Sequence, residues 1–155
     1  PSEKNIKTAS VHATEVGLAI DYRVGTAEDL AGAGEQFDVI LNMEVIEHVS
    51  DPAAFTRSCC SMLKPGGLMF VATLNRTLKS FGLAIIGAEY VLGWLPKGTH
   101  QWEKFITPDE LKGWLGANGV TVKSETGVVY RPLARDWRVS KDMNVNYMVV
   151  GERAI

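Results

Sequence analysis

FDVILNMEVIEHV, residues 37–49, is the stretch of this sequence that decides the fold class. It opens with a dense apolar run, Phe37 to Leu41, of the kind found in strands that are covered on both faces. Asp51 and Pro52 follow and predict the start of a helix, with Asp51 as the N-cap and Pro52 at the first helical position. A buried strand followed by a helix indicates an α/β fold with parallel strands.

The same alternation continues on both sides of this stretch. Upstream, the sequence predicts a helix capped by Ser2 and stopped by Gly17, and then a short strand at Ile20–Val24. Downstream, Lys64–Gly67 should end the second helix, because proline cannot continue a helix and glycine permits a tight turn. Leu68–Leu74 is the next predicted strand.

The final third of the chain breaks this rhythm. Thr107 predicts the N-cap of one more helix. Two strands then follow at about Thr121–Tyr130 and Asn144–Gly151, with a polar loop and no helix between them. The sequence therefore predicts an antiparallel hairpin at the edge of the sheet. Dinucleotide-dependent oxidoreductases usually lack such an ending, which disfavours that class.

Composition narrows the function classes. The 155 residues suit a single domain, and 16 basic against 18 acidic side chains give a net charge of -2. This balance offers no reason to expect a nucleic-acid partner. Cys59 and Cys60 lie in a helical pattern and are expected to be reduced core residues. No apolar run is long enough to span a bilayer and no signal peptide is recognised, so a cytoplasmic location is expected.

Residues 37–49, with Asp51-Pro52 and Leu63–Leu68, resemble the region after the cofactor-binding motif in class I S-adenosylmethionine-dependent methyltransferases. Five further motifs resemble the bacterial ubiquinone-biosynthesis O-methyltransferases: TLNRT at 73–77, GAEY at 87–90, PKGTH at 96–100, KFI at 104–106 and VNYM at 145–148. Members of that family methylate ring hydroxyls of polyprenyl phenols. The resemblance implies this reaction and S-adenosylmethionine as the cofactor.

The family also implies an architecture. Its Rossmann-like sheet has the strand order 3-2-1-4-5-7-6, opening with a glycine-rich loop and an acidic residue that hold the cofactor. This sequence begins at Pro1, beyond the place of both features. We therefore expect residues 1–155 to be a single partial methyltransferase domain without its first two strands, with a bare edge on the strand at 37–41 and a helical insertion at 77–98.

The resemblance assigns cofactor contacts residue by residue. Thr26, Ala27 and Glu28 fall in the loop that touches adenine, and Asn42 and Met43 fall in the turn beside the sulfonium. Methionine is flexible and polarisable, which suits that surface. The alternatives are that Glu28 helps to cap a turn and that Met43 fills the core.

Glu44, Glu47 and His48 allow three interpretations. If Glu44 starts a helical turn, positions i, i+3 and i+4 lie on one face and could bind Mg²⁺. Alternatively, His48 is a general base, because a phenol with a pKa of about 10 is a poor nucleophile at neutral pH. The third interpretation is structural, with His48 packed in the helix.

The insertion suggests a membrane contact. Its apolar part, residues 81–95, contains one charge, Glu89, and is shorter than the roughly 20 residues of a transmembrane helix. Lys79 and Lys97 flank it where anionic head groups would lie. We expect a cover over the substrate entrance that lies on the inner membrane, so that the protein is peripherally associated; the alternative is a core helix.

Two other functions remain open. One is a peripheral membrane or scaffold module without catalysis, and the other is a methyltransferase for a different phenol, an amine or an arsenical. The insertion favours the polyprenyl phenol, because a lipid-tailed substrate gives it a purpose. Other enzymes of ubiquinone biosynthesis are possible partners.

Overall fold

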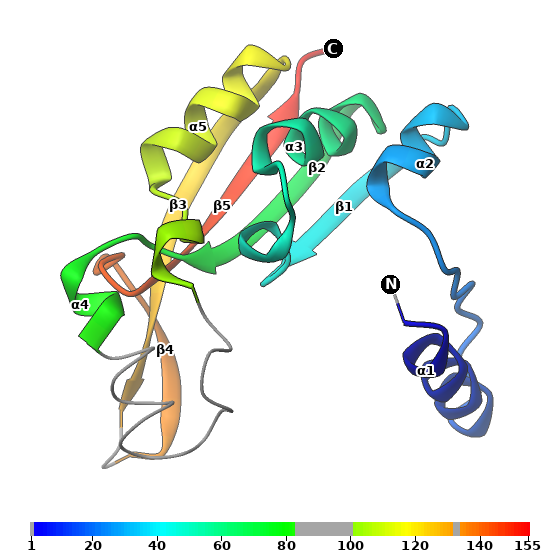
Figure 1. Cartoon of the computed structure of the whole chain (residues 1–155), viewed down its shortest axis with the longest axis horizontal. Coiled ribbons are helices and arrows are strands. Elements are labelled where there is room, and N and C mark those ends of the chain that lie inside the picture. The colour runs from blue at the N-terminus through cyan, green and yellow to red at the C-terminus, as the bar shows by residue number, and fades with distance from the viewer. Residues whose placement is uncertain (1, 83–100, 132–133) are drawn as a thin grey trace.

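The computed structural model describes residues 2–82, 101–131 and 134–155 (Figure 1). Its sheet has five strands in the order β1-β2-β5-β3-β4, with β1 and β2 parallel and every other neighbouring pair antiparallel. The strands are β1 (Phe37–Met43), β2 (Leu63–Leu74), β3 (Val120–Arg131), β4 (Asp136–Ser140) and β5 (Asn146–Arg153). The series β1-β2-β5-β3 corresponds to the 4-5-7-6 part of the expected order, so the predicted fold class and its antiparallel ending are confirmed.

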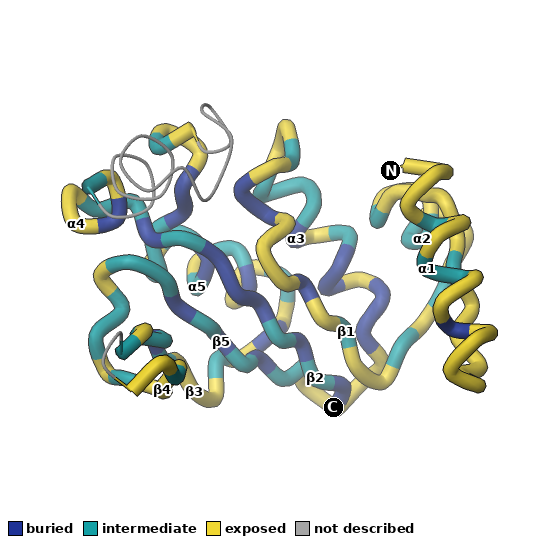
Figure 2. Tube along the Cα trace, turned by 90° about the horizontal axis from the view of Figure 1, so that it is seen from below, coloured by how far each residue is buried: buried dark blue, intermediate teal, exposed yellow. Residues whose placement is uncertain are grey.

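Strand β1 forms one edge of this sheet and has two unlike faces. Ile40 and Asn42 point toward the core, and Asn42 is only 4% exposed. Val39, Leu41 and Met43 alternate with them and are 51%, 68% and 44% exposed. Figure 2 shows the contrast with the interior strands: β5 and residues 67–74 of β2 carry only buried and intermediate positions.

The predicted turn at Lys64–Gly67 is present, but as a bulge inside a strand. Helix α3 (Pro52–Ser61) ends earlier than expected, and β2 begins at Leu63, opposite Phe37. The next pair is Val39 with Leu68, so residues 64–67 of β2 form a bulge opposite the single residue Asp38 of β1. A Cβ at Gly67 would lie 3.0 Å from the carbonyl oxygen of Asp38, so glycine is needed for this close approach.

Three helices cover one face of the sheet (Figure 1). Helices α3 and α5 (Pro108–Ala117) pack on the central strands, and α2 (Ala27–Gly32) packs beside α3. Asp51 caps α3 and Thr107 caps α5, as predicted. The core between these layers is formed by buried apolar residues of α3, β2, α5 and β5, including Cys59, Cys60, Met69, Val71, Leu111, Leu115 and Val149.

The structure has no strand at Ile20–Val24, so this prediction is wrong. Helix α1 (Glu3–Glu15) is capped by Ser2 as expected, but residues 18–26 form neither helix nor strand. Figure 1 shows that this segment and α1 lie apart from the sheet, on the side of β1. A strand forms only where a neighbour satisfies its backbone groups, and no described strand lies beside this segment. Ile20 and Val24 are each 49% exposed.

Strand β4 occupies the region predicted to be a polar loop. It pairs with Gly127–Arg131, the part of β3 that follows its pairing with β5. The expected pairing of the last two long strands is present, and β4 adds a short ribbon beyond it. The alternation of Trp137 and Val139 with Arg138 is a strand signal that the surrounding charges obscured.

The predicted insertion at 77–98 lies largely outside the described residues, which stop at 82 and resume at 101. Its first residues form α4 (Leu78–Ser80), capped by Thr77. Among the described parts of the chain, no helix combines the length and apolar character needed to cross a bilayer.

Candidate functional site

Two adjoining cavities lie between β1, the start of α2 and α3. Their volumes are about 380 Å³ and about 530 Å³. The first extends along β1, and the second reaches the turn that precedes α3. Both are lined by the same five residues, Gly25, Thr26, Ala27, Val45 and Phe55. The pair therefore forms a continuous hollow at the carboxyl end of β1, where α/β folds bind ligands.

Four of the five predicted cofactor contacts meet at this hollow. Thr26 and Ala27 line both cavities, Glu28 lines the second, and Asn42 lines the first. Met43 is not among the lining residues of either cavity. Its side chain is on the exposed face of β1, so it does not fill the core, and its predicted contact with the cofactor stays a prediction.

The loop before α2 is held rigid by its own cap. The Thr26 hydroxyl accepts a hydrogen bond from the Asp29 amide at 3.1 Å and donates one to the Asp29 carboxylate at 2.8 Å. The Thr26 amide donates to the same carboxylate. Thr26 and Asp29 therefore form the capping box of α2, and Glu28 is left at the cavity wall.

Asn42 is the most unusual polar residue of the hollow. Its side-chain oxygen is buried and has no hydrogen-bond partner within the described structure. A buried acceptor without a donor costs about 1–3 kcal/mol of stability. Because this residue lines the first cavity, its oxygen is a candidate acceptor for a donor group of a ligand.

The chain turns sharply after β1. Glu44 adopts a left-handed conformation, with φ of 54°, and a single 3-10 turn, η1 (Ile46–His48), follows. Glu47 points into the interior, where its Oε2 accepts a hydrogen bond of 2.8 Å from the hydroxyl of Thr73 on β2. Although much of Glu44 is exposed, burial of its carboxyl, the charge of Glu47 and a hydrogen bond to Glu47 raise the pKa of Glu44 to about 7.

This geometry does not support the predicted Mg²⁺ site. The left-handed Glu44 and the 3-10 turn replace the α-helical turn that would have placed Glu44, Glu47 and His48 on one face. Instead, Glu47 bonds to Thr73, and His48 lines the second cavity. Throughout residues 2–82, 101–131 and 134–155, no three or more acidic, histidine or cysteine side chains gather closely enough to hold a metal ion.

Several lining residues were not predicted. Gly25 directly precedes the predicted adenine loop, and its position is the signal that was available. Val45 and Phe55 line both cavities. Their apolar side chains give no chemical signal, so only the folded chain reveals their role.

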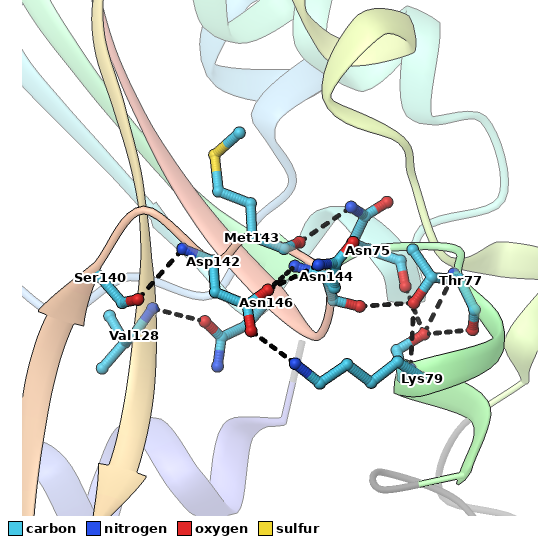
Figure 3. A network of polar contacts seen from close by, with 10 residues as sticks. Asn75, Thr77, Lys79, Val128, Ser140, Asp142, Met143, Asn144 and Asn146 are labelled. Atoms are coloured by element: carbon cyan, nitrogen blue, oxygen red, sulfur yellow. Dashed lines mark hydrogen bonds and ion pairs between the residues drawn. The ribbon is translucent and has the colours of Figure 1, made fainter.

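A polar network fixes the chain where it leaves β2 (Figure 3). The Asn75 amide donates to the carbonyl of Met143 at 2.9 Å, and the Thr77 hydroxyl donates to the carbonyl of Asn144. Lys79 pairs with Asp142 at 2.5 Å. These contacts join α4 to the turn between β4 and β5, so the entry to the insertion is held against the end of the sheet.

Comparison with known proteins agrees with the fold. The sequence profile described as "Methyltransferase domain" matches residues 4–125. The chain is 65% identical over 153 residues to a ubiquinone biosynthesis O-methyltransferase of Parvibaculum lavamentivorans, covering 99% of this chain and 60% of that protein. A protein of the same name from Methylobacterium nodulans is 57% identical over 155 residues, covering 100% and 62%. The predicted resemblance is thereby confirmed.

Solved structures with the same fold are more distant. The magnesium protoporphyrin IX methyltransferase of Synechocystis PCC 6803, solved with bound SAH, superposes with a TM-score of 0.63 at 19% identity, covering 99% of this chain and 61% of that one. The [4+2]-cyclase SpnF superposes with a TM-score of 0.68 at 16% identity, covering 99% and 64%.

The sheet order and the hollow at its carboxyl edge define an α/β protein of the class I methyltransferase fold. The chain belongs to the methyltransferase-domain family, whose profile matches most of its length. It spans about 60% of the length of the curated relatives that it matches.

Proposed function

We propose that the protein transfers a methyl group from S-adenosylmethionine to a ring hydroxyl of a polyprenyl phenol in ubiquinone biosynthesis. The relatives that share 54–65% of its residues carry the name of that activity. The observation that supports the proposal within the structure is the hollow beside β1, which gathers Thr26, Ala27, Glu28 and Asn42.

The hollow has the donor and acceptor character that the cofactor requires. Asn42 offers an unsatisfied buried oxygen to an amino group of the cofactor. Thr26 and Ala27 line both cavities with small side chains that leave room for a flat base, and Glu28 at the wall of the second cavity offers a carboxylate acceptor. Bound there, S-adenosylmethionine would supply an electrophilic methyl group on a sulfonium. The apolar Val45 and Phe55 would exclude water from it.

The chain's own part in the reaction is positioning and proton removal. A phenol must lose its proton to become a good nucleophile, and the imidazole of His48 at the wall of the second cavity can accept it at a ring nitrogen. Holding the oxygen in line with the methyl group removes much of the entropic barrier. The proposal assigns no step to a metal, because Glu44, Glu47 and His48 do not gather as a group of three that could hold one.

An activity assay with the full-length protein, labelled S-adenosylmethionine and a short-tailed polyprenyl phenol tests the proposal. Asn42→Leu should raise the KM for S-adenosylmethionine about tenfold, because it removes the acceptor at nearly constant volume. Asn5→Leu, the same substitution on the exposed helix α1, is the matched control. A wild-type protein that binds S-adenosylmethionine but methylates only amines or unprenylated phenols would favour the alternative substrates. A wild-type protein without methyl transfer to any of these substrates would favour a scaffold module.

His48→Ala should lower kcat by about 10²–10⁴-fold if His48 is the proton acceptor. His12→Ala, on the exposed helix α1, is the control and should leave kcat unchanged. A normal kcat for His48→Ala across the pH range would remove the catalytic role of this residue.

We further propose that the protein works at the anionic surface of the inner membrane, since a polyprenyl phenol resides in the bilayer. The apolar sequence 81–95 is the expected contact. Flotation with anionic vesicles should show binding that Ile85→Asp with Leu92→Asp weakens, once circular dichroism has shown that the variant folds. Association with other enzymes of ubiquinone biosynthesis stays a prediction.

A further inference from the structure

The ribbon of β3 and β4 carries an exposed apolar face far from the hollow. Tyr130 and Trp137 are paired directly across the two strands, as are Val128 and Val139. Directly opposed residues of an antiparallel pair share one face, and so do alternate residues of one strand. The four side chains therefore form a single patch, which we call the ribbon face.

Most of the ribbon face is open to solvent. Trp137 is 65% exposed, Val139 77% and Tyr130 41%. The Tyr130 and Trp137 rings lie against each other with centroids 5.1 Å apart, which fixes them as one aromatic unit. Clustered exposure of this kind marks an interaction site more often than scattered single residues do.

The segment around β4 is basic overall. From 131 to 142 the sequence has four cationic side chains, Arg131, Arg135, Arg138 and Lys141, and two acidic ones, Asp136 and Asp142. Both acids are engaged by cations, since Arg131 binds Asp136 and Lys79 binds Asp142. This segment is net positive in a chain whose total charge is -2.

We infer that the ribbon face is a docking surface for an anionic lipid bilayer. Tryptophan and tyrosine settle at the interface between head groups and acyl chains. Arginine side chains of the segment around β4 are long enough to reach anionic head groups while the apolar face enters the boundary. An interface that combines apolar, aromatic and cationic groups matches such a bilayer.

The contact between the ribbon and α4, at the end of β2, supports the choice of a bilayer. Lys79 and Thr77 tie α4 to the turn that ends β4, so the ribbon is fixed next to the point where the chain leaves β2 (Figure 3). Leu78, in the middle of that contact, is 84% exposed. A bilayer held by the ribbon would therefore meet the same end of the sheet. The choice of a bilayer rests on the proposed function, whose substrate resides in a membrane.

Co-sedimentation of the full-length protein with vesicles tests the inference. The vesicles consist of phosphatidylcholine alone or of phosphatidylcholine with an equal part of phosphatidylglycerol. We expect binding to the mixed vesicles, reduced about tenfold or more by Trp137→Ser with Val139→Ser. Ile155→Ser replaces an apolar residue that is fully exposed elsewhere on the molecule. This variant is the control and should bind like the wild type.

A second pair of variants tests the charge. Arg135→Gln with Arg138→Gln should lower binding to the mixed vesicles about tenfold and make it less sensitive to salt. Lys4→Gln with Lys7→Gln on α1 removes the same charge elsewhere and should have a smaller effect.

Three results would overturn the inference. The first is a wild type that does not sediment with mixed vesicles, and the second is ribbon variants that bind as tightly as the wild type. The third is a dimer, seen by light scattering, that Trp137→Ser with Val139→Ser dissociates, because a second copy would then cover the face. Methyl transfer to a detergent-dispersed substrate should be unchanged in these variants, which separates failure of docking from failure of the proposed function.

Discussion

The hydroxyl of Thr73 and the carboxylate of Glu47 form a hydrogen bond of 2.8 Å between two side chains that are 0% and 3% exposed. Thr73 lies near the end of β2, and Glu47 lies in the turn after β1. The bond therefore fixes the turn that carries His48 to the wall of the second cavity.

Thr73→Val should lower the free energy of unfolding by about 1–3 kcal/mol, because it removes the donor to the buried Oε2 of Glu47. Thr73→Ser keeps the hydroxyl and should lower the free energy of unfolding much less. Urea denaturation followed by circular dichroism measures both. Equal stability of the valine variant and the wild type would show that another group satisfies Glu47.

The raised pKa of Glu44 predicts a dependence of stability on pH. The folded chain holds a proton on Glu44 up to about pH 7, whereas the unfolded chain releases it near the ordinary value of 4.5. The contribution to stability is thus full below about pH 4.5 and is lost as the pH rises toward 7. Glu44→Gln should remove this part of the dependence of the free energy of unfolding on pH. Because Glu44 is partly exposed, we expect a change below about 1 kcal/mol.

Urea denaturation of Glu44→Gln at pH 5 and at pH 8 makes the comparison. Glu15→Gln, at the exposed end of α1, is the control and should retain the slope of the wild type. An unchanged slope in Glu44→Gln would mean that the pKa of Glu44 is not raised in the folded chain.

Gly127 lies where the turn after β4 crosses β3. A Cβ at this position would lie 2.0 Å from the carbonyl oxygen of Asp142, which is backbone and cannot rotate away. Gly127→Ala should therefore cost about 1–3 kcal/mol of stability. Gly113→Ala, in α5 with no atom within 4 Å, is the matched substitution. It should stabilise the protein by roughly 0.5–1 kcal/mol. Thermal unfolding compares them, and similar shifts in Tm would contradict the prediction.

Tyr147 on β5 is 1% exposed and donates a hydrogen bond of 3.0 Å from its hydroxyl to the carbonyl of Ile106. Burial raises the pKa of this tyrosine well above its usual value, so the donor persists at alkaline pH. Tyr147→Phe should lower the free energy of unfolding by about 1–2 kcal/mol, whereas Tyr130→Phe on the exposed ribbon should change it little. A stable Tyr147→Phe variant would show that the Ile106 carbonyl finds another donor.

The parts of the fold that sequence predicted correctly depend on local signals. Asp51 and Thr107 mark helix starts because capping needs only the residues of the first turn. The apolar run from Phe37 marks β1 because apolar and β-branched residues favour strands, although only one face of β1 is covered in the structure. Thr26, Ala27 and Asn42 came from the family's motif positions, and the structure brings them to one hollow.

The errors have non-local causes. Ile20–Val24 has the composition of a strand but no described neighbour to pair with. Strand β4 was missed because its sequence is charged, and pairing with β3 rather than burial forms it. The predicted Mg²⁺ site is not supported, because the left-handed backbone at Glu44 breaks the helical turn that would have placed the three side chains on one face.

The order of the strands has a consequence for synthesis. Strand β5 follows β2, β3 and β4 in the sequence, yet it lies between β2 and β3. During translation the two halves of the sheet have no means of joining until β5 leaves the ribosome. Until then β2 and β3 each present an unpaired edge on that side, which is the state that chaperones bind and that aggregates most readily.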